Sequence, residues 1–205
     1  MPHARRLFTF KLSGNSYKVR LFLGMLGLDF EAIEVDMRGG EHKRAPFLAL
    51  NPLGQVPVLV DGDVTLADSQ AILVYLARRY AAVSWLPQDP VLLAHITRWL
   101  SIAANEIQHG PATARLIALF GVKLDRELAL KRSAAILAYM DSHLTQQQWL
   151  VGDHPTVADV ACYPYIALAP EGHIDLQQYP QLSLWLTRME ALPGFVPMVG
   201  PAASA

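Results

Sequence analysis

Two different spacings of hydrophobic residues divide this chain. Up to residue 80, short runs with a strand-like pattern alternate with segments whose apolar residues recur at helical spacing. The predicted elements are a strand, a helix, a strand, a short helix, two hairpin strands and a helix, at residues 7–10, 16–26, 30–35, 47–50, 58–66 and 68–80. After residue 90 only helical periodicity remains, at residues 91–109, 123–145, 156–169 and 180–191. Strands first and helices afterwards indicate two domains.

A turn-rich segment separates the two patterns. It contains Trp85-Leu86-Pro87 and Asp89-Pro90, and prolines at such spacing interrupt regular structure. The sequence therefore predicts an α/β domain at residues 1–82, a linker at 83–90 and an all-helical domain at 91–205.

The composition excludes several classes of protein. Hydrophobic residues make up 52% of the chain and charged residues 17%, which favours a well-packed globular protein over a disordered one. The formal net charge of −1 gives no polybasic signature for nucleic acid or for an anionic membrane. A single cysteine, Cys162, excludes an internal disulfide and a cysteine-based zinc cluster. There is no apolar secretory segment and no apolar run of about 18 residues, so the cytoplasm is the expected location.

Four short motifs, in this order, resemble those of the cytosolic glutathione S-transferase family. They are Ser13-Gly14-Asn15 before a helix, Gln55-Val56-Pro57 before the hairpin, Asp68-Ser69 followed by Ala71-Ile72, and Gly152-Asp153 followed by Thr156-Val157-Ala158-Asp159. The resemblance covers about residues 7–190. It implies a thioredoxin-like α/β domain followed by an all-α helical bundle, with glutathione as the co-substrate, no metal, and a homodimer.

The Gln55-Val56-Pro57 motif is the first predicted contact with glutathione. Only about 5–6% of X-Pro bonds are cis in folded proteins, so the residues alone favour a trans bond. The resemblance implies a cis bond, because thioredoxin-like folds carry a cis-proline here. A cis bond would leave the N–H and C=O of Val56 free to pair with an extended tripeptide, as in strand addition.

Asp68 and Ser69 stand where a helix is predicted to begin. Their residue types suit an N-cap, which stabilises a helix by roughly 1 kcal/mol. A helix N-terminus also binds anions, so Ser69 can donate its hydroxyl to the γ-glutamyl carboxylate while Asp68 receives the α-ammonium group. Both interpretations can hold together.

His42 lies in a predicted loop at residues 38–42. A lone histidine in a loop is usually a solvated side chain. The resemblance to theta-like members implies instead that His42 contacts the glycyl carboxylate of glutathione, with Lys43 as the alternative.

The chemistry is predicted to depend on the turn from Ser13 to Ser16. A thiol with a pKa near 8.5 is only slightly ionised at neutral pH, and lowering that pKa by two units requires about 2.7 kcal/mol. A hydroxyl, an amide and a helix N-terminus can supply this stabilisation together. The turn has no tyrosine and no cysteine, which argues against the tyrosine-using classes and against beta-like and omega-like mixed-disulfide chemistry.

The resemblance places Ser13 and Asn15 on the Thr-x-Asn positions of the nu-like class, and Ser13 on the serine of the theta-like and zeta-like classes. We expect Ser13, then Asn15, then Ser16 to stabilise the thiolate. The alternative is that Ser13-Gly14-Asn15 is only a turn and that Ser16 is the N-cap of the helix.

Residues 99–110 resemble the fourth-helix segment of beta-like members. The positions that approach the sulfur there hold Ser101, Gln108 and His109 here, which argues against beta-type catalysis. His109 can still stabilise a thiolate or protonate a leaving group, since its reference pKa is about 6.5. The alternative role for His109 is a cation at a helix C-terminus.

The sequence therefore predicts a transferase in which the thiolate of glutathione attacks a small hydrophobic electrophile in a cleft against the helix at residues 91–109. Reduction of disulfides or peroxides, as in nu-like members, starts from the same bound thiolate and is an alternative. A non-catalytic binding module of the same fold is a second alternative. Loss of the glutathione contacts would mark it, and here Val56-Pro57 and Asp68-Ser69 are both present.

Overall fold

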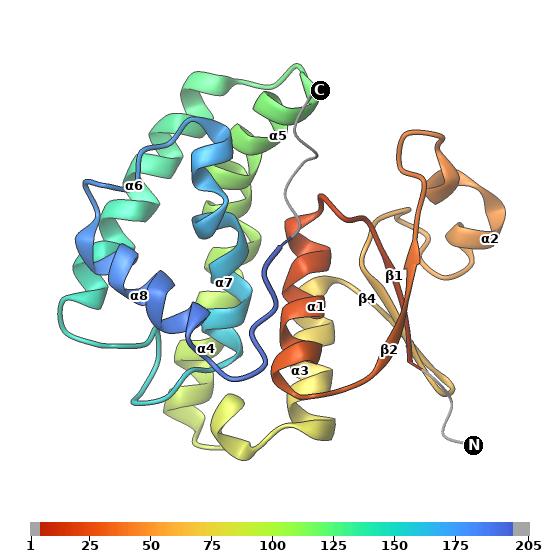
Figure 1. Cartoon of the computed structure of the whole chain (residues 1–205), viewed down its shortest axis with the longest axis horizontal. Coiled ribbons are helices and arrows are strands. Elements are labelled where there is room, and N and C mark those ends of the chain that lie inside the picture. The colour runs from red at the N-terminus through yellow and green to blue at the C-terminus, as the bar shows by residue number, and fades with distance from the viewer. Residues whose placement is uncertain (1–4, 199–205) are drawn as a thin grey trace. The chain divides into compact units, whose positions relative to one another are not determined.

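The computed structural model of the protein describes residues 5–198 (Figure 1). This part of the chain forms two compact units, and residues 5–80 form the first together with residues 193–198. The second unit is residues 81–192. The sequence predicts that the helical domain continues to the end of the chain, whereas residues 193–198 belong to the first unit. Residues 1–4 and 199–205 of the expected domains lie outside the described residues.

The first unit is built on a four-stranded sheet. Its strands are β1 (Arg5–Thr9), β2 (Phe30–Glu34), β3 (Val58–Asp61) and β4 (Val64–Ala67), in the spatial order β2-β1-β3-β4. β1 is parallel to β2 and antiparallel to β3, and β3 forms the predicted hairpin with β4. Helices α1 (Gly14–Met25) and α3 (Ser69–Tyr80) lie on one side of the sheet, and α2 (Ala45–Leu48) lies on the other (Figure 1). The predicted thioredoxin-like arrangement is confirmed.

Alternation along the strands explains why both sides of this sheet are covered. Leu7 of β1 is opposite Leu59 of β3, and both side chains are buried. Because neighbouring residues of a strand point to opposite faces, Phe8 and Val58 lie on the other face. There they pack with Phe47 of α2, whose ring centroid is 6.2 Å from that of Phe8. Burying one such side chain contributes about 1.5–3 kcal/mol.

Two helices of the first unit begin earlier than the sequence predicted. α1 starts at Gly14 because Ser13 is its N-cap, and the Ser13 Oγ accepts a hydrogen bond from the Ser16 N–H at 3.1 Å. α2 starts at Ala45, where Pro46 suits the first turn of a helix. A short 3₁₀ turn at Glu41–Lys43 also occupies part of the predicted loop.

The second unit is helical, as predicted. Its α-helices are α4 (Pro90–Ala104), α5 (Thr113–Phe120), α6 (Arg126–Leu144), α7 (Val157–Ala167) and α8 (Pro180–Glu190). A π-helical turn at Gln108–Ala112 precedes α5, and 3₁₀ turns lie at Val83–Trp85 and Ala169–Gly172. In the part of the chain that the structure describes, none of the helices is long and apolar enough to cross a membrane.

α5 is absent from the helices that the sequence predicts. Gly110-Pro111 indicates a helix end, but here the wider π-turn accommodates Pro111 and helical structure resumes at Thr113. α5 is then held by an ion pair in which the buried Arg115 Nε lies 2.6 Å from the Glu171 Oε2. A Cβ at Gly172 would lie 2.8 Å from the backbone nitrogen of Arg115, so the turn that carries Glu171 packs directly on this helix.

The Thr156-to-Asp159 motif caps α7 and also makes contacts beyond this helix. Thr156 and Asp159 form a capping box, and the Asp159 Oδ2 accepts from the Thr156 N–H at 2.9 Å. The other oxygen, Oδ1, accepts from the Leu150 N–H and from the Trp185 Nε1–H, each at 3.0 Å. Asp159 is completely buried, so one carboxylate joins the loop before α7 to α8.

We predict that Asp159→Ala lowers the free energy of unfolding by about 3–5 kcal/mol, because it leaves several buried N–H groups without an acceptor. Urea unfolding measures this loss. Asp153→Ala, which changes an exposed aspartate of the same loop, is the matched control and should shift the value by less than about 0.5 kcal/mol. Equal effects of the two substitutions would contradict the assigned role.

Candidate functional site

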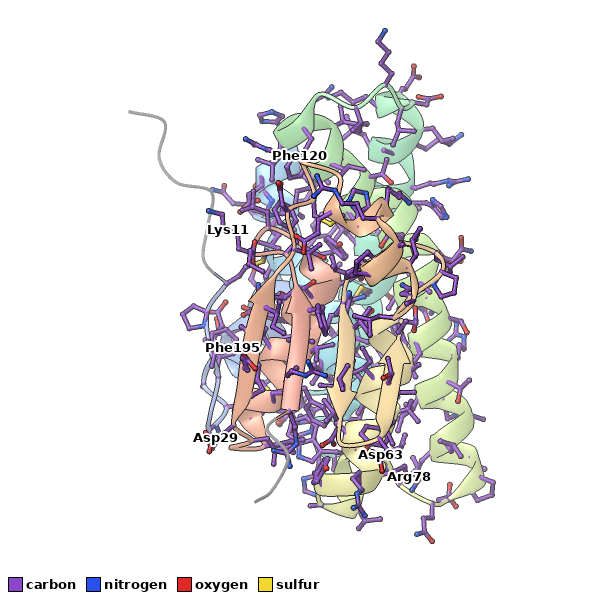
Figure 2. The ribbon with its side chains drawn as sticks, turned by 90° about the vertical axis from the view of Figure 1, so that its right-hand side faces the viewer. Lys11, Asp29, Asp63, Arg78, Phe120 and Phe195 are labelled. Atoms are coloured by element: carbon purple, nitrogen blue, oxygen red, sulfur yellow. The ribbon has the colours of Figure 1, made fainter. Side chains whose placement is uncertain are left out.

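The predicted site residues of the first unit come from elements that meet at one end of the sheet. Phe8 of β1 is opposite Val58 of β3, and Val58 is opposite Ala67 of β4. Because these strands alternate in direction, the last residue of β1, the first residue of β3 and the last residue of β4 lie at the same end of the sheet. Figure 2 shows Lys11, which follows β1, at this end, and Asp29, which precedes β2, at the opposite end.

In the turn after β1, Ser13 is partly exposed and Ser16 is buried. Ser13 and Asn15 are both partly exposed at the N-terminus of α1. The Ser13 Oγ accepts the Ser16 N–H, and the Ser13 O–H donates to no other residue of the described chain. Ser13 is therefore both the helix cap and a hydrogen-bond donor at the surface.

Ser16 does not fit either role that the sequence suggested for it. Its side chain is fully buried, and its Oγ accepts a hydrogen bond from the Phe10 N–H at 3.4 Å. A ligand at the surface cannot reach this hydroxyl without displacing the turn. The N-cap is Ser13, so Ser16 is corrected to a structural residue that holds the loop against α1.

The segment before β3 has the geometry that the resemblance implied. The Val56–Pro57 peptide bond is cis. No main-chain hydrogen bond joins Val56 to another residue of the described chain, so its N–H and C=O can pair with a ligand. The Gln55 side chain is exposed, and its carbonyl accepts a hydrogen bond from the Asn51 Nδ2 at 2.8 Å.

Asn51 is a supporting residue that the sequence analysis did not single out. It is 5% exposed, and its Oδ1 accepts from the Leu53 N–H at 3.1 Å while its amide holds the Gln55 carbonyl. In the sequence, Asn51-Pro52 is only a local turn signal. The hydrogen bond from the Asn51 amide to the Gln55 carbonyl holds the loop that contains Val56.

Asp68 and Ser69 form the N-terminus of α3. The Asp68 Oδ1 accepts from the Gln70 N–H at 2.9 Å and from the Ala71 N–H at 3.0 Å, which confirms the predicted cap. Oδ2 accepts no hydrogen bond within residues 5–198. Ser69 is 3% exposed, and its hydroxyl donates to the Gln70 Oε1.

Asp68 also has a backbone conformation that aspartate rarely adopts. Its φ is 74°, in the left-handed region. Such a conformation in a residue other than glycine costs about 1–3 kcal/mol and tends to occur at functional sites. It turns the chain sharply between β4 and α3.

His42 and Lys43 lie against the turn that precedes Val56. The Lys43 Nζ donates to the Leu53 carbonyl at 3.3 Å. The His42 carbonyl would be 2.6 Å from a Cβ at Gly54, which keeps this position for glycine. The His42 Nδ1 is buried and has no hydrogen-bond partner within the described residues.

A cavity of about 540 Å³ lies next to the Ser13 turn. It is formed by the segments that follow β1 and β2, residues 10–12 and 34–38. Phe10, Leu12, Val35 and Met37 give it apolar walls. A space of this size and character suits a small hydrophobic molecule.

His109, the remaining predicted catalytic residue, belongs to the second unit. It lies in the π-helical turn, is exposed, and borders a groove of about 540 Å³ between α4 and α6. Arg98 and Tyr139 line the same groove, with the Arg98 guanidinium 5.5 Å from the centre of the tyrosine ring. Among the described residues, no group of three or more His, Cys, Asp or Glu side chains is placed to hold a metal ion.

Comparison with known proteins gives a consistent result for both units. Residues 7–84 match the family model described as the glutathione S-transferase N-terminal domain, and residues 116–193 match the one described as the C-terminal domain. Glutathione S-transferase 3 of Zea mays is 33% identical over 98% of this chain and 98% of its own.

Solved structures resemble the whole described fold. A glutathione S-transferase from Pseudomonas fluorescens is 35% identical, with a TM-score of 0.89 over 96% of this chain and 99% of that one. A glutathione transferase homolog from Lodderomyces elongisporus, solved with two glutathione molecules per subunit, is 27% identical, with a TM-score of 0.84 over 93% of this chain and 95% of that one.

Proposed function

Because this chain belongs to the glutathione S-transferase family, we propose that it ionises the thiol of bound glutathione and transfers the glutathionyl group to a small hydrophobic electrophile. One observation carries the proposal. The unpaired main chain of Val56, the donor hydroxyl of Ser13 and the N-terminus of α3 all lie at one end of the sheet.

Val56 binds the middle of the tripeptide. Its N–H and C=O pair with the main chain of the cysteinyl residue, which lies extended beside the start of β3. This contact recognises the backbone and leaves the cysteinyl side chain free to point elsewhere. The thiol can then approach the turn at Ser13, which belongs to the same end of the sheet.

The two ends of glutathione bind to separate groups. The γ-glutamyl carboxylate receives hydrogen bonds at the N-terminus of α3, where the Ser69 hydroxyl exchanges Gln70 for the ligand. The α-ammonium group binds the open Oδ2 of Asp68. The glycyl carboxylate binds near His42, whose buried Nδ1 has no partner in the described chain, with Lys43 as the alternative.

Ser13 stabilises the thiolate. A hydrogen bond to a charged group contributes about 1.5–3 kcal/mol, and the N-terminus of a helix adds about 0.3–1 kcal/mol. Together these cover the roughly 2.7 kcal/mol that lowers a thiol pKa by two units. Asn15 is the second residue of this turn that we assign to the thiolate.

The apolar cavity beside the turn holds the electrophile. The thiolate sulfur attacks an electrophilic carbon there, a carbon–sulfur bond forms, and the leaving group departs with its bonding electrons. The proton of the thiol has already been released to water. Cys162 is completely buried in α7, so the glutathione thiol, rather than a protein thiol, carries this chemistry.

Reduction of a mixed disulfide is a second candidate reaction. The thiolate of one glutathione attacks the glutathionyl sulfur of the mixed disulfide, the original S–S bond breaks, and the other thiol leaves as its thiolate. The product, glutathione disulfide, therefore contains one glutathionyl unit from free glutathione and one from the mixed disulfide. The similar protein from Lodderomyces elongisporus holds two glutathione molecules per subunit, which suits this stoichiometry. Assays on an aryl halide, a hydroperoxide and a mixed disulfide distinguish the reactions.

We also propose that two chains form a homodimer through the groove between α4 and α6. Arg98 and Arg132 line this groove together with Glu106, so it carries both signs of charge. A two-fold interface places the same patch of both subunits together, and mixed charges allow such a patch to pair with itself. His109 lies in this groove, and its catalytic role stays a prediction.

The cytoplasmic location also stays a prediction.

We predict that Ser13→Ala lowers kcat/KM at about pH 6.5 by about 30–100-fold, because the thiolate loses a donor worth about 2–2.7 kcal/mol. Thiolate absorbance at about 240 nm in the glutathione complex should fall in parallel. Ser13→Thr keeps the hydroxyl and the cap and should retain most activity, and Asn15→Ala should have a smaller effect than Ser13→Ala. Binding of glutathione to the unaltered protein without thiolate absorbance would instead indicate a binding module.

We predict that Asp68→Asn raises the KM for glutathione about tenfold, the equivalent of about 1.4 kcal/mol, with little change in Tm. Asparagine keeps the capping oxygen and tolerates a left-handed backbone, so only the charge is lost. Calorimetry with a glutathione analogue that lacks the α-amino group is the control. If Asp68→Asn weakens that analogue as much as glutathione, Asp68 does not bind the ammonium group.

We predict that Tyr139→Glu converts a dimer of 22.6 kDa chains into monomers, because a carboxylate would be buried in the paired groove. Light scattering at several protein concentrations measures the mass. Leu184→Glu, at a 52% exposed leucine of α8, is the matched control and should leave the dimer intact. A monomeric unaltered protein would disprove the proposed assembly.

A further inference from the structure

Arg20 joins α1 to the segment that leads into the Ser13 turn. Its Nη1 donates to the Thr9 Oγ1 at 2.9 Å, and its Nη2 donates to the Lys11 carbonyl at 3.1 Å. Thr9 is the last residue of β1, and Lys11 lies in the loop after it. One guanidinium therefore holds both the end of the strand and the start of the loop.

Glu34 holds the same loop from the opposite side. It is the last residue of β2, and its Oε1 accepts a hydrogen bond from the Lys11 N–H at 2.8 Å. The N–H and the C=O of Lys11 are thus bound by side chains of opposite charge, which come from two different elements. Hydrogen bonds with a charged partner are shorter and stronger than neutral ones.

Arg20 is itself fixed by its surroundings. Its guanidinium lies 5.9 Å from the centre of the Tyr17 ring, and the Tyr17 hydroxyl donates to the Val196 carbonyl at 2.7 Å. Burial lowers the pKa of Arg20, while the charge of Glu34 acts in the opposite direction. An arginine remains protonated in either case, so the two donated hydrogen bonds persist across the usual pH range.

The position of this loop matters for the Ser13 hydroxyl. Ser13 lies two residues beyond Lys11, and its N–H bonds back to the Phe10 carbonyl at 2.9 Å. Residues 10–12 lie between β1 and α1 and belong to neither element. A displacement of about 1 Å in a group that acts on a reacting atom can reduce a rate about a hundredfold.

We propose that Arg20 and Glu34 are positioning residues that hold the C=O and the N–H of Lys11 and so set the place of the Ser13 hydroxyl. This inference rests on the proposed function, in which that hydroxyl stabilises the thiolate of glutathione. Neither residue needs to touch glutathione, although Glu34 borders the cavity assigned to the electrophile, so the thiol pKa in the glutathione complex is the primary readout. Their effect is transmitted through the loop to the ionisation of the bound thiol.

The test compares two variants of Glu34, which is exposed, so that folding is preserved. Glu34→Gln and Glu34→Ala remove the same negative charge, but only glutamine keeps an oxygen to accept the Lys11 N–H. The loss of charge alone favours the thiolate in both variants equally. The difference between them therefore reports the position of the loop.

Titration of the absorbance at about 240 nm in the glutathione complex gives the pKa of the bound thiol. We expect this pKa to be about 0.5–1 unit higher in Glu34→Ala than in Glu34→Gln. The corresponding kcat/KM should be about three- to tenfold lower at about pH 6.5, and the two variants should converge above pH 9 or so.

A second pair of variants tests Arg20. Arg20→Lys keeps the charge but cannot reach both Thr9 and Lys11. It should therefore raise the pKa of the bound thiol above its value in the unaltered protein. Thr9→Val removes the other partner of Arg20 and leaves the Lys11 contact, so its pH profile should match that of the unaltered protein. A structural role alone would change Tm in both members of this pair without separating their pH profiles.

The possible outcomes are distinct. If the unaltered protein lowers the thiol pKa of glutathione but Glu34→Ala titrates like Glu34→Gln, the positioning role is wrong and the proposed function stands. If the unaltered protein does not lower that pKa, both are wrong. The inference is supported if the thiol pKa is higher in Glu34→Ala than in Glu34→Gln and higher in Arg20→Lys than in the unaltered protein.

Discussion

The pairing of β1, β3 and β4 is the constraint on which the candidate site depends. Phe8, Val58 and Ala67 lie side by side across the three strands, so the segments beyond them meet at one edge. A slip of one residue would turn Leu7 and Leu59 away from the helices and Phe8 away from α2. The core therefore fixes the register, and the register brings Ser13, Val56 and Asp68 to the same end of the sheet.

Local signals in the sequence predicted much of this arrangement. Asp61-Gly62 is a signal for a tight hairpin turn, and Thr156-x-x-Asp159 is a signal for a helix cap; both are local, because turns and caps depend on residues close together in the chain. The start of α1 was less certain from sequence, since Ser13 and Ser16 are both suitable caps. In the structure the Ser13 Oγ accepts the Ser16 N–H, so Ser13 is the cap, while the Ser16 side chain is buried.

The parts that could not be predicted depend on contacts between distant residues. Asn51-Pro52 is a local turn signal, and nothing in the neighbouring sequence indicates that the Asn51 amide donates to the Gln55 carbonyl. Glu34 and Arg20 are ordinary charged residues in the sequence, and their common partner, Lys11, becomes visible only when β1 and β2 pair. α5 was missed because a π-turn absorbs Pro111, which normally ends a helix.

Asp68 shows how folding and ligand binding can be separated at one position. Asparagine caps helices as well as aspartate does and adopts the left-handed conformation at least as readily, so folding could use either residue. A carboxylate at a helix N-terminus adds about 0.3–1 kcal/mol at most. This stabilisation does not exceed the lower end of the cost of the left-handed backbone conformation, which is about 1–3 kcal/mol. Asparagine would carry the same cost. The remaining reason for a negative charge here is the open Oδ2, which can bind a cationic group of a ligand, and this is the feature of Asp68 that the fold alone does not require.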